Sequence, residues 1–182
     1  DFGMAATGGV QGIALGPMPH AACIVPERRE ERTTEGGLEV AGDQNRLSHY
    51  IGPLNDAGIR VSLFIAADRG QIEAAARIGA PVVELHAGAY TDYDADGDFA
   101  ARDAELARII DGVKLGADLG LEVHVGHGLN YDTVAPIAAL PEVAELNIGH
   151  FLIGEAIFRG LKPAIGEMRR LMDDARGADY SQ

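Results

Sequence analysis

The chain has 182 residues, 47% of them hydrophobic, and a formal net charge of −13, so it is long enough for one substantial core. The excess of acidic residues excludes nucleic acid and an anionic membrane as main partners, because both need a basic surface. Small phosphorylated substrates stay possible, because backbone N–H groups at glycine loops and helix ends bind phosphate without a basic surface.

We expect a single domain over residues 1–182 with no membrane span, because no apolar run approaches the roughly 18 residues that a bilayer requires. No targeting segment is expected either. The single cysteine, Cys23, cannot form an internal disulfide, and its apolar setting predicts a buried, unreactive thiol. A reducing compartment, the cytoplasm, is the predicted location.

Short apolar runs alternate with amphipathic stretches along the chain. The runs predict strands at Ala21–Val25, Arg60–Ala66, Pro81–Ala87, Leu121–Val125 and Glu145–Phe151, with Asp1–Ala5 as the end of a sixth. The stretches between them predict helices at Gln44–Ala57, Asp68–Ile78, Asp98–Leu119, Thr133–Leu140 and Leu161–Ala175. This alternation predicts a parallel α/β sheet or barrel.

Two polar segments interrupt this order. Pro26–Val40 is too long and too polar for a simple turn, and we weigh a lid that brings Thr33 or an arginine to a substrate against an ordinary charged surface loop. Ala89–Gly97 is rich in aspartate and predicts a solvated surface loop.

The late strands carry polar residues on one face and aliphatic residues on the other. Glu84 and His86 share a face, opposite Val83 and Leu85. A sheet covered on both faces would be apolar on both, so the polar face predicts the lumen of a barrel. Glu84, His86 and Asn147, near strand ends, are expected in a pocket. Glu122 and Glu145, near strand starts, favour solvated positions at the other end.

Two loops near the end of the chain carry a glycine beside a histidine. His127 stands between Gly126 and Gly128 after a strand, where the backbone can approach a ligand and the imidazole can transfer a proton near neutral pH. Gly149-His150 ends the next predicted strand, and Gly154-Glu155-Ala156 is expected to open a helix with an anion-binding N-terminus. A metal site is not expected, because His124 and His127 face opposite sides of an extended strand.

Five ordered segments carry a family resemblance: VPERREERTTEGGLEV, VSLFIAAD, VVELHAGAY, VGHGLNY and ELNIGHFLIGEAIFRGL. Together they resemble pyridoxine 5′-phosphate synthase over nearly the whole chain, with TTEGGL, GHGL and ELNIGH the most specific. The resemblance implies a (β/α)8 TIM barrel that assembles as a homo-oligomer, commonly an octamer. It implies condensation of 1-deoxy-D-xylulose 5-phosphate with 3-amino-2-oxopropyl phosphate to pyridoxine 5′-phosphate, phosphate and water, without metal or organic cofactor.

The resemblance also implies roles for individual residues. His127 matches the family's proton-donating histidine, and Gly128 lies against the aminoketone phosphate. Gly149 and His150 match the loop at that substrate's phosphate. Thr33 matches a lid threonine at the deoxyxylulose phosphate, and Glu84 matches a glutamate of the lumen.

Two departures from the family follow from the same alignment. Nothing in the chain corresponds to the family's first two βα units, so we expect a partial barrel that covers about strands 3 to 8. Gly3 stands where the family has a catalytic glutamate, and glycine cannot accept a proton. The alternatives are therefore an impaired or non-catalytic phosphate-binding remnant, or another phosphate-handling barrel lyase or isomerase. Because Lys114 and Lys162 lie in helical patterns, a Schiff-base enzyme is disfavoured.

Overall fold

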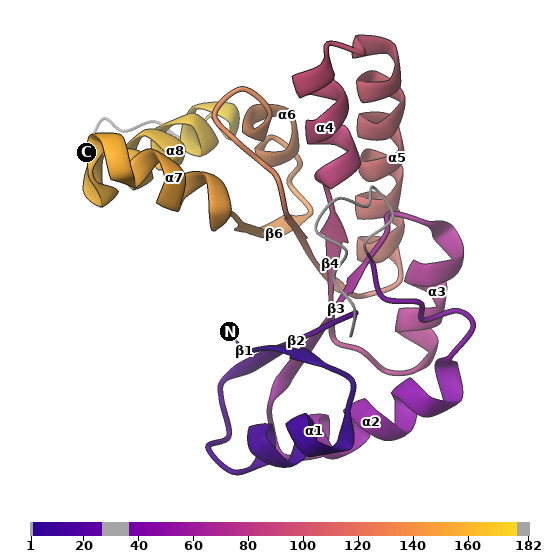
Figure 1. Ribbon diagram of the computed structural model, residues 1–182. Helices are drawn as coiled ribbons and strands as arrows, with labels where there is room; N and C mark the ends of the chain where they lie inside the picture. The colour runs from indigo at the N-terminus through magenta and orange to yellow at the C-terminus, as the bar shows by residue number, and fades with distance from the viewer. Residues whose placement is uncertain (1, 27–36, 178–182) are drawn as a thin grey trace.

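The computed structural model describes residues 2–26 and 37–177, and its centre is one parallel sheet of six strands (Figure 1). The strands are β1 (Phe2–Ala5), β2 (Ala21–Val25), β3 (Arg60–Ile65), β4 (Val82–His86), β5 (Glu122–Gly126) and β6 (Val143–Asn147). They lie side by side in chain order, and every neighbouring pair is parallel. This is the arrangement of consecutive βα units in a barrel wall.

The helices are α1 (Gly8–Leu15), α2 (Gln44–Asp56), α3 (Arg69–Arg77), α4 (Gly88–Asp96), α5 (Phe99–Asp118), α6 (Val134–Ala138), α7 (His150–Arg159) and α8 (Leu161–Ala175). Several begin and end where the sequence predicts. Asp68 caps α3 by accepting hydrogen bonds from the amides of Gly70 and Gln71. Gly58 and Gly120 follow α2 and α5 with φ of 78° and 79°, the left-handed conformation that lets a helix stop and turn into a strand.

The aliphatic faces of the central strands form the main core beneath the helices. Val61, Leu63, Val83, Leu85 and Val123 are all buried there. Helices α2 and α3 pack on β3, and α5 packs on β4 and β5. The predicted division of each strand into a helix-facing apolar side and a polar side is confirmed for these strands.

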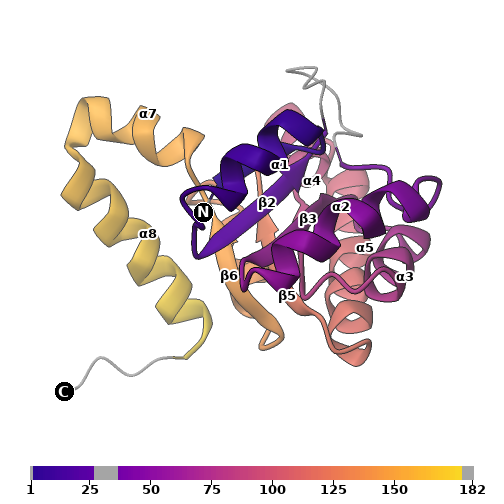
Figure 2. The same cartoon turned by 90° about the horizontal axis from the view of Figure 1, so that it is seen from below.

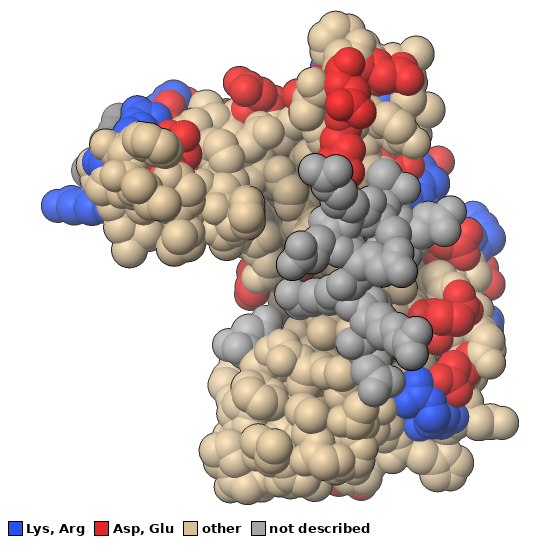
Figure 3. Space-filling view, viewed as in Figure 1, with Lys and Arg blue, Asp and Glu red and all other residues tan. Residues whose placement is uncertain are grey.

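The barrel wall is open among the described residues. Strands β1 and β6 are its two edges, with no pairing between them, so the predicted partial barrel is confirmed. Helices α7 and α8 lie apart from α1 to α5 (Figure 2), and α8 packs on α6. Helix α7 contains no buried residue, and its main contacts are with α8. In the space-filling view a deep notch separates α7 and α8 from α1 and α2 (Figure 3).

Two element predictions were wrong. Gly88–Asp96 is helix α4 rather than a surface loop, because its first turn is buried against the core: the Tyr90 hydroxyl donates to the Thr133 carbonyl at 3.2 Å. Its aspartates follow on the outer turn, and Gly97, with φ 75°, ends the helix. Strand β6 ends at Asn147 rather than Phe151, and α7 begins at His150, one turn earlier than Gly154.

None of the helices in the described parts of the chain combines the length and apolarity that crossing a bilayer demands.

Candidate functional site

Neighbouring strands bring the predicted site residues to the same end of the sheet, where the carboxyl ends of the strands lie. His127 follows β5, and Gly149 and His150 follow β6, its neighbour in the sheet. The ends of these two strands are joined by the His127 amide, which donates to the Asn147 carbonyl at 3.4 Å. His127, Gly128, Gly149 and His150 are all exposed. Loops at this edge form the active sites of barrel enzymes.

Glu84 lies in the middle of the polar face, on β4. Its carboxylate accepts a hydrogen bond from the side-chain Nδ2 of Asn147 at 3.0 Å and one from the Cys23 thiol, with Sγ 3.7 Å away. Glu84 is 8% exposed. Burial raises the pKa of this carboxyl, and the hydrogen bond from Cys23 opposes that rise. A carboxyl held in this way keeps its proton to higher pH than an exposed glutamate does.

Gly126 leaves the space that this carboxylate fills. A Cβ at position 126 would lie 2.2 Å from Glu84 Oε1 and 3.1 Å from the Asn147 carbonyl. The first glycine of the GHG motif is thus required by the packing of Glu84. The second glycine is required by its positive φ and by the space that Thr91 occupies. Gly128 has φ 89°, and a Cβ there would lie 2.3 Å from the Thr91 hydroxyl oxygen.

His127 itself adopts a backbone conformation that is unusual for a side-chain-bearing residue, with φ 71°. Such a conformation costs about 1–3 kcal/mol and persists only where the surroundings impose it. The β5 loop is held against the β4–α4 turn, where the Ala87 amide donates to the Gly126 carbonyl at 2.8 Å. Among the described residues with a side chain, Met18, with φ 48°, and the histidine predicted to transfer a proton are those with a positive φ.

A charged cluster joins the starts of β3 and β5 to the middle of β6. Arg60 Nη1 lies 2.8 Å from Glu122 Oε1, and its Nη2 lies 3.8 Å from Glu145 Oε2. Glu122 also contacts Nε2 of the buried His124, 2.6 Å away. Glu122 and Glu145 are 38% and 42% exposed, as expected of half-solvated ion-pair partners. Glu122 lies at a strand start as predicted, but Glu145 lies in the middle of β6, in register with His124 and through it with Glu84, and its charge helps to raise the pKa of Glu84.

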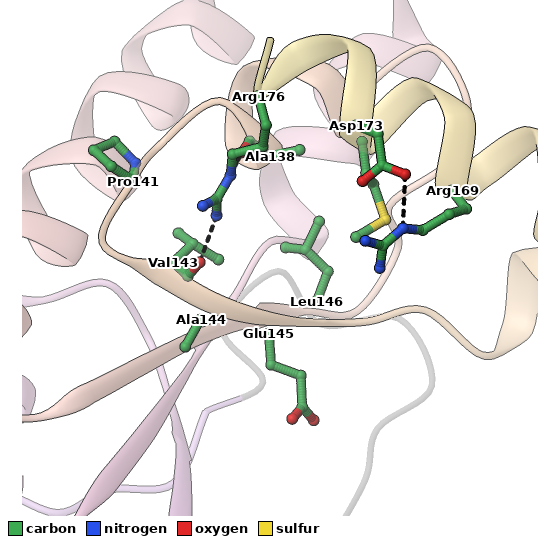
Figure 4. Close-up of a pocket in the computed structure, with 10 residues that line it drawn as sticks. Ala138, Pro141, Val143, Ala144, Glu145, Leu146, Arg169, Asp173 and Arg176 are labelled. Carbon is green, nitrogen blue, oxygen red and sulfur yellow. Dashed lines mark hydrogen bonds and ion pairs between the residues drawn. The ribbon is translucent and has the colours of Figure 1, made fainter. Parts of the chain in front are cut away.

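A hollow of about 530 Å³ lies between β6, α6 and α8 (Figure 4). Its two arginines already have partners: Arg169 lies 2.7 Å from Asp173, and Arg176 donates to the Val143 carbonyl at 2.5 Å. None of the sequence-predicted site residues lines it. The hollow follows the open edge of β6 and is therefore a product of the unclosed wall rather than a candidate active site.

The structure places Gly3 on β1 beside Cys23 of β2, in register. Because paired residues of parallel strands point to the same face, a side chain at position 3 would point to the face that carries Cys23 and Glu84. A Cβ there would meet nothing within 4 Å. Thr33 lies outside the described residues. Where the described chain resumes, Gly37 packs on the end of β3, with its Cβ position 2.4 Å from the Ala66 amide.

Sequence reasoning missed two features of the site. One is the contact of Cys23 with Glu84, which makes the thiol part of the polar face rather than of the core alone. The other is the pairing of His86 with His127, whose rings stack with centroids 4.7 Å apart. The alternation of β4 puts His86 on the correct face, but no spacing rule reveals which ring of the next strand it meets.

The sequence is similar to those of known proteins. Curated relatives called pyridoxine 5′-phosphate synthase occur in Jannaschia sp. (strain CCS1), 80% identical over 176 residues, and in Ruegeria pomeroyi, 69% identical over 176 residues. Each alignment covers 97% of this chain and 71% of the relative. Relatives at this identity share the fold and the order of motifs.

Solved structures of distant proteins share the fold alone. One is an HpcH/Hpal aldolase/citrate lyase family protein from Burkholderia cenocepacia J2315, with TM-score 0.57, 13% identity, and coverage of 96% of this chain and 76% of that one. Another is a xylose isomerase domain protein from Planctomyces limnophilus, with TM-score 0.56, 14% identity, and coverage of 93% and 70%.

The family described as pyridoxal phosphate biosynthesis protein PdxJ matches residues 1–174. The match includes β1 to β6, the GHG loop and the Gly149-His150 loop. The chain therefore belongs to the PdxJ family.

Proposed function

We propose that the chain carries the proton-donating histidine and the phosphate-side loops of a pyridoxine 5′-phosphate synthase. The reaction would condense 1-deoxy-D-xylulose 5-phosphate with 3-amino-2-oxopropyl phosphate and release phosphate and water. One observation carries the proposal. The neighbouring strands β4, β5 and β6 bring together Glu84, His127 and the Gly149-His150 loop.

The proposed chemistry is general acid and base catalysis. Imidazole is the usual side chain for proton transfer near neutral pH, and His127 is exposed at the mouth of the site, so it suits the role of proton donor. Glu84, whose pKa is raised mainly by burial, suits a second transfer within the lumen. Gly128, exposed beside His127, is assigned to contact with the aminoketone substrate.

The phosphate groups would bind at the loops. Helix α7 begins at His150, with Gly149 before it, and the first amides of a helix have no partner within that helix. Together with the positive end of the helix dipole they favour an anion. We assign this position to the phosphate of the aminoketone substrate, and Thr33 to that of deoxyxylulose phosphate.

Gly3 favours a second candidate, a phosphate-binding protein with impaired or no catalysis. The position is exposed and faces the lumen side, and no described residue lies within 4 Å of a Cβ there to supply the missing carboxylate. A third candidate, a Schiff-base lyase, lacks its lysine among the strand ends: Lys114 lies in α5 and Lys162 in α8.

A ring-closure assay separates these candidates. The two phosphorylated substrates are incubated with the parent chain, with Gly3→Glu and with the double variant Gly3→Glu/His127→Ala, and pyridoxine 5′-phosphate is measured. Product from Gly3→Glu but not from the double variant supports the synthase. Phosphate binding without product in any of the three supports the second candidate. Gly8→Ala is the control, because position 8 is exposed in α1 and a Cβ there meets nothing within 4 Å.

We also propose that the protein forms homo-oligomers in the cytoplasm. Two strand edges are unpaired among the described residues, and α7 exposes Ile153, Ile157 and Phe158. Open edges and apolar patches of this kind promote association. Sedimentation at several protein concentrations tests this, and a single monomeric species throughout would contradict it.

A further inference from the structure

His86 is enclosed on every side that the structure describes. Its ring is 6% exposed and meets the edge of Phe64, with centroids 5.1 Å apart and an interplanar angle of 77°. Its other face stacks on His127, at 4.7 Å and 25°. The Gly88 amide donates to its Nδ1 at 3.3 Å. The ring therefore has little freedom to rotate.

Both imidazole rings pack against Gly88. A Cβ at position 88 would lie 2.4 Å from His86 Cε1 and 3.3 Å from His127 Cδ2. Only a residue without a side chain lets both rings lie against the first turn of α4. The two histidines and Gly88 thus form a packed unit at the mouth of the site.

The chemistry of His86 suits support rather than proton transfer. Burial, followed by the nearby His127 and Arg108 charges, lowers the pKa of His86 to about 4. The ring is therefore neutral at pH 7. With Nδ1 accepting from Gly88, the proton lies on Nε2. A neutral neighbour can stack on His127 in either protonation state without repelling it.

We propose that His86 is a positioning residue whose ring fixes the orientation of His127 by stacking against it. The proposal rests on the proposed function of His127 as the proton donor. It explains how an exposed side chain on a strained backbone keeps one orientation: the αL conformation aims the side chain, and the stacked ring stops its rotation. A rotation that moved the imidazole by about 1 Å would reduce a proton-transfer rate by up to about 100-fold.

The first test follows the ring of His127 by NMR in the chain labelled with ¹³C-histidine. A stacked aromatic ring shifts the His127 ring protons upfield. We expect His86→Phe to keep that shift and His86→Leu, of similar volume but without a ring, to lose it. His86→Gln is a second ringless variant that retains an acceptor for Gly88. Far-UV circular dichroism shows which variants are folded.

The second test measures catalysis in the Gly3→Glu background. We expect His86→Leu to lower kcat about 10- to 100-fold with KM changed less than about threefold, and His86→Phe to restore most of that loss. A merely structural role would lower the amount of folded protein and leave kcat per folded molecule unchanged.

The outcomes separate the two proposals. Unchanged His127 signals in a folded Leu or Gln variant would overturn the role of His86, whether or not product forms. Lost signals in the ringless variants, retained signals in Phe and no product from any protein would support the positioning role and reject the synthase. If product forms, an equal kcat for Gly3→Glu with and without His86→Leu would also overturn the positioning role.

Discussion

Gly88→Ala tests the packing of the two imidazoles directly. The new Cβ would lie 2.4 Å from His86 Cε1, whereas carbon atoms in contact lie about 3.5–4.0 Å apart, so the ring must move by about 1 Å or more. His86 is buried and in contact with Phe64 and His127, so its ring moves only by displacing a neighbour. Overpacking of this kind costs about 1–3 kcal/mol. The loss of glycine flexibility in the unfolded chain returns about 0.4–1 kcal/mol.

We therefore expect Gly88→Ala to lower the free energy of unfolding by about 1–2 kcal/mol. The matched control is Gly8→Ala, since Gly8 and Gly88 are both the first residue of a helix and only position 88 is crowded. Urea denaturation at one fixed protein concentration measures both, because association makes the midpoint depend on concentration. Equal midpoints for the two variants, with unchanged His86 and His127 NMR signals, would refute this account of the packing.

The remaining predictions concern the carboxyl group of the lumen, a helix cap and the outer helices. Because burial raises the pKa of Glu84, the folded state holds its proton more tightly than the unfolded chain, and stability is lost as the pH rises above the ordinary value of 4.5. The free energy of unfolding of Glu84→Gln should therefore exceed that of the parent increasingly as the pH rises from 4.5 to 7, and the two should be equal below pH 4.5. A difference that does not depend on pH would contradict this. Asp68→Ala should cost about 1 kcal/mol in urea denaturation, because two amides of α3 lose their acceptor, and no loss would show that water replaces the cap. Phe158→Ser, at a side chain 86% exposed, should change the free energy of unfolding by less than about 0.5 kcal/mol yet weaken self-association in sedimentation, and unchanged association would exclude α7 from the contact.

Much of the fold was predictable because its signals are local. Strand β4 reads Val-Val-Glu-Leu-His, and its period of two separates Val83 and Leu85 from Glu84 and His86 without knowledge of any neighbour. Helix ends at Gly58 and Gly120 follow from the left-handed conformation that glycine permits. The GHG and Gly149-His150 loops were predicted from glycine and histidine at strand ends, and parallel pairing then brings them to one edge.

The features that were missed depend on contacts between distant segments. Helix α4 is rich in aspartate, and it belongs to the core because its first four residues are buried, with the Tyr90 hydroxyl donating to the Thr133 carbonyl. The stack of His86 on His127 requires the pairing of β4 with β5 and the positive φ of His127. Neither is encoded in the spacing of residues along the chain.

The position of α7, whose main contacts are with α8, has a consequence for the dynamics of the two halves of the site. Helix α7 has no buried residue, so its opening exposes little apolar surface and costs little free energy, whereas opening β4 or β5 disrupts the main core. Amide protons near His150 should then exchange with solvent much sooner than those of Leu85 or Val125. An anion that holds the start of α7 would slow that exchange, so this weakly packed helix would report occupancy while the core half of the site, with His127, stays unchanged.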